Sequence, residues 1–198
     1  QLDGATFCFS SGATTEGNVA DFAAANGMKY KSVTFGSMGE SQKAYNAGRC
    51  DVFTTDKFGL GARRTSMTNP SEHMILPETI SNEPISPMVP HGDQVWKDIV
   101  VWTLNALIAA EEHGITSKNI DDMRDNSKNP FVQRMLGKTG KFGNKIGLGK
   151  DWAYNAIKAV GNYGEIWERN LGKDGLGMPR GKNTLHTKGG LLISPPFR

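Results

Sequence analysis

Two short polar segments contain the residue types that could bind a charged small molecule. The first, Ser10–Glu16, reads Ser-Ser-Gly-Ala-Thr-Thr-Glu and follows the apolar run Phe7–Phe9. It is typical of a strand that passes through a turn of small residues into a helix, whose first N–H groups can bind an anion. The second, Thr54–Asp56, follows Val52–Phe53 and offers one carboxylate, which can hold a cation. If both open into one cleft, they predict a site for a zwitterion such as a free amino acid.

The first part of the chain alternates apolar runs with helical patterns, which would position both segments. Strands are expected at 5–9, 30–35, 50–54 and 74–76, and helices at 15–26, 40–47 and 57–65. Such alternation over short connections predicts βαβ units and a parallel sheet. Ligands of doubly wound sheets bind beyond the carboxyl ends of the strands where the winding direction reverses, between the first strand and the third. The two polar segments follow these two strands.

After residue 83 the pattern changes to amphipathic helices. They are expected at 93–113, 120–123, 131–136 and 151–170, followed by an irregular tail at 172–198. The tryptophans of these helices recur at helical spacing and are expected in a core: Trp96, Trp102, Trp152 and Trp167. These helices need an apolar partner, yet the second half of the chain offers at most one or two short strands. A sheet that would cover them is therefore missing.

The composition fits a globular protein and argues against several functions. The chain has 198 residues, 37% of them hydrophobic, and a net charge of +3. Its apolar stretches are too short to span a membrane. Lys and Arg are scattered and do not alternate with aromatic residues, so nucleic acid is not expected as a partner. The start of the chain has neither a basic nor an apolar targeting segment, so any signal peptide is absent or was removed.

Cys8 and Cys50, the two cysteines, each lie in a strand-like run. They are either two buried thiols or one disulfide that joins neighbouring strands and implies an oxidising compartment, and spacing alone does not decide. Because no histidine cluster lies near them, they argue against a structural zinc site. The four histidines are too dispersed to form a metal site or a catalytic pair. We expect no metal and no cofactor.

Three segments resemble the general L-amino-acid-binding proteins of bacterial ABC importers: Ser11–Glu16, Ala47–Asp56 and Gly161–Asn170. The similarity extends from Leu2 to Arg198. It implies a two-lobed periplasmic receptor that closes around an L-amino acid and delivers it to a membrane permease. In this family the second lobe is one continuous segment, and the first lobe is built from both ends of the chain.

The resemblance implies an α/β fold of the periplasmic-binding-protein type. Residues 1–83 would form a complete lobe two, with three layers around a central, mainly parallel sheet. Residues 84–198 would be the returning, mainly helical part of an incomplete lobe one. Family members carry roughly a hundred further residues before the segment that begins here. The chain is thus expected to be a shortened piece, a proteolytic product or a natural short form, whose exposed helical faces favour self-association.

The resemblance also assigns ligand contacts. Backbone N–H groups of Ser11, Gly12, Ala13 and Thr14, with the Thr14 hydroxyl, would bind the α-carboxylate of the ligand. Asp56 would pair with its α-ammonium group. Many relatives have a hydroxyl residue in place of Ala13, so one side-chain hydrogen bond is expected to be absent here.

Each of these residues has a structural alternative. Thr14, Thr15 and Glu16 are of types that cap N–H groups in a first helical turn, and Asp56 could be the N-cap of the helix that begins at Lys57. The resemblance favours ligand contacts for Thr14 and Asp56. Glu16 is expected to cap the helix or lie on the surface. A further acid, Asp51, is expected to be solvated or paired with a neighbour such as Arg49.

A dehydratase-like enzyme on the same fold is an alternative function, with Ser10, Ser11 or Thr14 beside Asp56. An activated nucleophile needs a positioned base, however, and neither motif contains His or Lys. We therefore predict a binding protein and not an enzyme. A truncated or degenerate form without ligand binding is the other alternative.

Overall fold

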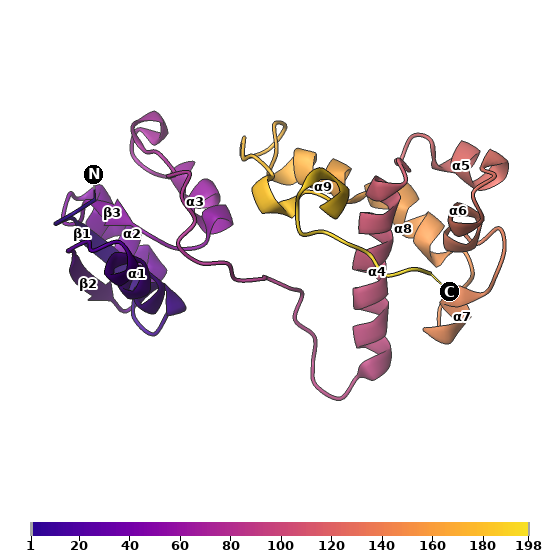
Figure 1. Cartoon of the computed structure of the whole chain (residues 1–198), viewed down its shortest axis with the longest axis horizontal. Helices are drawn as coiled ribbons and strands as arrows, with labels where there is room; N and C mark the ends of the chain where they lie inside the picture. Colours follow the sequence, from indigo (N-terminus) through magenta and orange to yellow (C-terminus); the bar gives the residue numbers. More distant parts are fainter. Residues whose placement is uncertain (1, 198) are drawn as a thin grey trace. The chain divides into compact units, whose positions relative to one another are not determined.

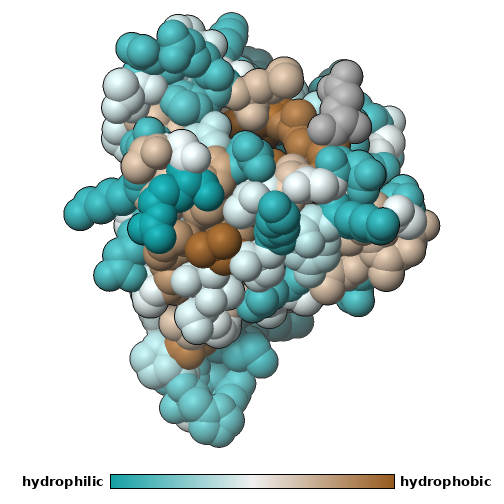
Figure 2. Space-filling model, turned by 90° about the vertical axis from the view of Figure 1, so that its left-hand side faces the viewer, coloured by the Kyte–Doolittle hydropathy of each residue, from teal (hydrophilic) through white to brown (hydrophobic). Residues whose placement is uncertain are grey.

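The computed structural model describes residues 2–197. The chain divides into two compact units, Gln1–Ile85 and Ser86–Arg198 (Figure 1), each with its own hydrophobic core. The identification of these units with lobe two and with part of lobe one stays a prediction. On the face shown in Figure 2, hydrophobic side chains form small separate areas among hydrophilic ones, which is usual for a globular protein.

A parallel sheet of three strands lies at the centre of the described part of the first unit. The strands are β1 (Thr6–Ser10), β2 (Lys31–Phe35) and β3 (Val52–Phe53). Their order is β2-β1-β3, and in the register Cys8 of β1 lies opposite Val33 and Phe53. The predicted parallel sheet is confirmed, and the winding direction reverses between β1 and β3 as expected.

The strand expected at 74–76 does not form. The chain there follows a short 3-10 helix, η1 (Pro70–Glu72), and pairs with no strand. Met74 remains 75% exposed. An apolar run of three residues becomes a strand only where a sheet edge accepts its hydrogen bonds, and this run finds none among the described residues.

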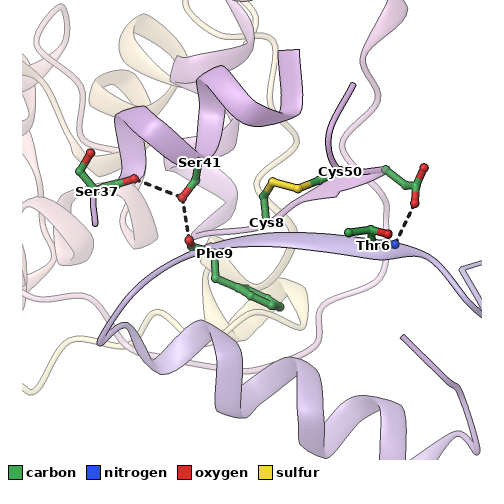
Figure 3. The surroundings of a disulfide bond; sticks show 7 residues. Thr6, Cys8, Phe9, Ser37, Ser41 and Cys50 are labelled. Carbon is green, nitrogen blue, oxygen red and sulfur yellow. Dashed lines mark hydrogen bonds between the residues drawn. A yellow bond between two sulfur atoms is a disulfide. The ribbon is translucent and has the colours of Figure 1, made fainter. Parts of the chain in front are cut away.

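Helices cover both faces of the sheet. They are α1 (Thr14–Ala25), α2 (Met38–Asn46) and α3 (Lys57–Arg64). Because successive side chains of a strand point to opposite faces, Phe7 and Phe9 pack with Val19 of α1. Cys8 belongs to the other core, with Ala44 of α2 and Leu60 of α3. Figure 3 shows a helix on either side of β1, so the unit has three layers.

Two side-chain links fix β1 just before the polar turn (Figure 3). Cys8 and Cys50 form a disulfide with Cα atoms 5.8 Å apart, which decides between the two alternatives for these cysteines. The fully buried hydroxyl of Ser41 in α2 donates to the Phe9 carbonyl oxygen over 2.7 Å. Asp51 is not paired with Arg49 as expected, because its carboxylate accepts the Thr6 N–H at 2.8 Å and prolongs the β1–β3 pairing.

The second unit is helical. Its helices are α4 (Gln94–Glu112), α5 (Ile120–Asn126), α6 (Pro130–Met135), α7 (Phe142–Lys145), α8 (Trp152–Val160) and α9 (Tyr163–Asn170), with the 3-10 helices η2 (Gly181–Asn183) and η3 (His186–Lys188). Phe197 is 1% exposed and packs between aromatic side chains of the core. Trp96 is 48% exposed, contrary to expectation, because the core cluster on α4 begins only at Trp102. None of the helices within 2–197 combines the length and the apolar character needed to cross a lipid bilayer.

The long helix expected at 151–170 is divided into α8 and α9. Gly161 between them has a φ of +82°, and buried Asn162 begins α9 with a capping box. Its amide oxygen accepts the Glu165 N–H at 2.9 Å, and the Glu165 carboxylate accepts the Asn162 N–H at 2.8 Å. The apolar stripe continues through both helices, which is why periodicity alone predicts one.

We expect the disulfide to contribute about 2–4 kcal/mol to the stability of the first unit, because it closes a loop of 42 residues. Replacing both Cys8→Ala and Cys50→Ala should raise amide hydrogen exchange throughout β1, measured by mass spectrometry. A reducing agent should produce the same change in the wild type and none in the double variant. Equal exchange in oxidised wild type and double variant would contradict the assignment.

Glu165 should make the second unit sensitive to acid. Burial raises its pKa, but hydrogen bonds from Asn162 and Ser117 outweigh burial and bring the pKa below the ordinary 4.5. Such a carboxylate stabilises the fold fully above its ordinary pKa, and this stabilisation is lost as the pH falls below it. Urea unfolding followed by tryptophan fluorescence reports this unit, because all four tryptophans lie in it.

Replacement of Glu165→Gln should lower stability at neutral pH by about 0.5–2 kcal/mol and flatten the decline below about pH 4.5. Asp98→Asn is the matched control, because this exposed acid of α4 has no hydrogen bond to another described residue. The same acid dependence in wild type and Glu165→Gln would disprove the role of the carboxylate.

Candidate functional site

The turn after β1 leaves the start of α1 without a side-chain cap. Gly12 adopts a φ of +73°, which glycine tolerates best, and Ala13 is the N-cap residue. Alanine has no side chain that could accept the first N–H groups of the helix. The N–H of Ser11 donates to the Phe35 carbonyl oxygen of β2 over 2.7 Å, so it is not free for a ligand as expected. Gly12 and Thr14 donate no backbone hydrogen bond within the described chain.

The Thr14 hydroxyl does not cap α1 but binds a carboxylate. It donates to Glu83 Oε2 over 3.3 Å, and Asn18 Nδ2 donates to Glu83 Oε1 over 2.6 Å. Sequence reasoning missed Asn18 and Glu83. The four-residue spacing of Thr14 and Asn18 places both on one helical face and was an available signal. Glu16 does not cap the helix either, because its carboxylate accepts the Ser32 hydroxyl at 3.0 Å.

Asp56 occupies the N-cap position of α3 without acting as a side-chain cap. Its backbone carbonyl accepts the Leu60 N–H at 2.9 Å. The side chain is exposed, and no hydrogen bond or ion pair joins its carboxylate to another residue of 2–197. The adjacent Lys57 donates to the Pro77 carbonyl oxygen over 2.8 Å. The structural alternative for Asp56 thus covers its backbone only.

The topology brings the two predicted segments to one edge of the sheet. β1 and β3 are adjacent and parallel, so Thr14 and Asp56 both follow carboxyl ends of neighbouring strands, about 4.8 Å apart. The edge therefore combines uncapped helical N–H groups and a hydroxyl with one unpaired acid. Within 2–197 no group of three or more His, Cys, Asp or Glu residues is arranged to hold a metal.

A polar cavity of about 350 Å³ in the first unit lies away from this edge. It is lined by residues from the end of α2 and from the segment around η1, which includes His73. Both ring nitrogens of His73 are engaged, one with the Tyr45 hydroxyl at 2.9 Å and one with the Thr68 carbonyl oxygen at 2.8 Å. This histidine is therefore fixed structurally and offers no base to the candidate site.

Comparison with known proteins gives full-length matches, although no family model matches the chain. The general L-amino acid-binding periplasmic protein AapJ of Rhizobium johnstonii is 52% identical over all of this chain and 59% of its own length. The glutamate/glutamine/aspartate/asparagine-binding protein BztA of Rhodobacter capsulatus is 48% identical, again over 100% of this chain and 59% of its own length.

A solved structure agrees with these relatives. It is an ABC transporter periplasmic binding protein from Brucella ovis with glutathione bound, with a TM-score of 0.91 and 48% identity over 100% of this chain and 62% of that one. The chain spans about three-fifths of the length of the relatives it matches. Along its whole length it is a homologue of the amino-acid-binding periplasmic proteins of bacterial ABC transporters.

Proposed function

We propose that this chain belongs to the solute-binding component of an amino-acid ABC importer and binds free L-amino acids in the periplasm. The observation that carries the proposal is the pairing of an unpaired Asp56 carboxylate with an uncapped start of α1 at one edge of the sheet. Names of relatives that bind amino acids support it, and the disulfide fits an oxidising compartment.

In the proposed complex the ligand is held at both charged ends. Its α-carboxylate accepts hydrogen bonds from Gly12 and Thr14 N–H groups and from the Thr14 hydroxyl, while its α-ammonium group donates to Asp56. Ala13 contributes its backbone only. In the intact receptor, closure of the lobes would signal occupancy to the permease.

The recognition of both α-groups leaves the rest of the ligand variable. The γ-glutamyl end of glutathione also carries a free α-ammonium and a free α-carboxylate, so it presents the same two groups as an amino acid. Probes should therefore be the four amino acids in the name of BztA, together with glutathione. A dehydratase is the weaker alternative, because the edge offers no base that could activate a hydroxyl.

Asp56→Asn should reduce affinity for L-glutamine by about 10- to 100-fold, because it removes a charge-assisted hydrogen bond. Since Thr14 and Asp56 are exposed to water, we expect weak binding and propose chemical-shift titration, which detects it. Asp21→Asn is the control, because this acid of α1 is exposed and unpaired within the described chain. Undiminished affinity of the Asp56 variant would refute its role, and loss of free L-glutamine over a day would support an enzyme.

We also propose that two copies of the chain associate through α4. Val95, Trp96 and Val101 are 60%, 48% and 43% exposed. Val100 and Leu104 of the same helix line a hollow of about 150 Å³ with Ser86 and Pro87. A helix with this apolar surface gains free energy when another apolar surface covers it.

Sedimentation equilibrium should therefore show a concentration-dependent dimer. Replacing Val95→Glu and Val101→Glu together should weaken it at least tenfold, because each copy would bury two charges. Lys97→Gln on the same helix should leave the dimer unchanged. A monomer at about 1 mM protein would contradict this proposal, because a dimer so weak gains less than about 4 kcal/mol.

A further inference from the structure

We infer that Glu83 is a built-in competitor for the carboxylate of the ligand. Its own carboxylate occupies the side chains of Thr14 and Asn18 until a ligand displaces it. This inference rests on the proposed function and adds a regulatory contact at the same site. It also makes Asn18, which the sequence did not single out, part of the carboxylate-binding surface.

The contact already has the chemistry of the proposed complex. Thr14 and Asn18 lie one turn apart on α1, and each donates to a different oxygen of Glu83, over 3.3 and 2.6 Å. Asn18 Nδ2 also donates to the Ser81 hydroxyl over 3.2 Å. A carboxylate is thus bound at the start of α1 in the absence of any ligand, and it belongs to the chain itself.

The segment that bears Glu83 runs along the candidate site. At one end the Pro77 carbonyl oxygen accepts the ammonium group of Lys57, the residue after Asp56. In the middle Ile80 packs against the core that contains Phe9. At the other end Ser81 and Glu83 meet the first turns of α1. Residues 77–83 therefore form a strap from the start of α3 to the start of α1, just before the first unit ends at Ile85.

The strap is held loosely enough to be displaced. Thr14 and Glu83 are both exposed, so water screens their interaction. Glu83 accepts no backbone N–H group of α1 within the described chain. A ligand carboxylate can accept the N–H groups of Gly12 and Thr14 as well as the hydroxyl, and its ammonium group gains Asp56. The ligand therefore gains partners that Glu83 does not use, which allows exchange.

Chemical-shift titration of the full 198-residue chain with L-glutamine tests this inference. Glu83→Gln should bind about three- to tenfold more tightly than the wild type, because the competing carboxylate is gone. Glu78→Gln removes the same charge from the same strap and should bind as the wild type does, since Glu78 has no hydrogen bond within 2–197. Far-UV circular dichroism should confirm that both variants are folded.

A second readout separates displacement from a general charge effect. Saturating L-glutamine should raise amide hydrogen exchange of residues 77–83 in the wild type, whereas in Glu83→Gln exchange should already be raised without ligand. Equal or weaker affinity of Glu83→Gln, or unchanged exchange of the strap on binding, would overturn the inference and leave the receptor proposal intact. Absence of shifts in all three proteins would overturn both.

Discussion

The pairing of β1 with parallel neighbours on both sides is the constraint on which the candidate site depends. It makes the winding direction reverse at β1, so the chain leaves β1 and β3 toward helices on opposite faces of the sheet. The Cys8–Cys50 disulfide and the buried Ser41 hydroxyl fix β1 in this position from the side of α2. The polar turn is therefore presented by a rigid strand, although its own residues are mostly exposed.

Much of this architecture could be predicted because its signals are local. Apolar runs and small-residue turns indicated the three strands and the helices between them, and alternation indicated the parallel order. The errors occurred where a local pattern had no unique meaning. The apolar stripe of 151–170 continues across Gly161, so the interruption was visible only in the capping residues Asn162 and Glu165. The run at 74–76 lacked a partner strand, and no local pattern reports a partner.

The candidate site divides in the same way. The residue types at Thr14 and Asp56 and their places after β1 and β3 followed from the sequence and its resemblance. Their side-chain surroundings did not, because Glu83 is 69 residues from Thr14 along the chain. The register of β1 with β2 likewise determines that the Ser11 N–H meets Phe35 and is taken from the predicted donor set. Such pairings arise from tertiary structure, so spacing in the sequence does not contain them.

The satisfaction of polar groups separates the segments that suggested the family. Asn162 and Glu165 satisfy each other, and they also bind the Ile115 carbonyl oxygen and Ser117, so this segment has a structural explanation within the chain. The start of α1 lacks a side-chain cap, and the Asp56 carboxylate lacks a partner within the described chain. A fold tolerates such groups at little cost while water reaches them, and they then remain available to a solute. Of two motifs that resemble the same family equally well, only the unsatisfied one is therefore suited to bind.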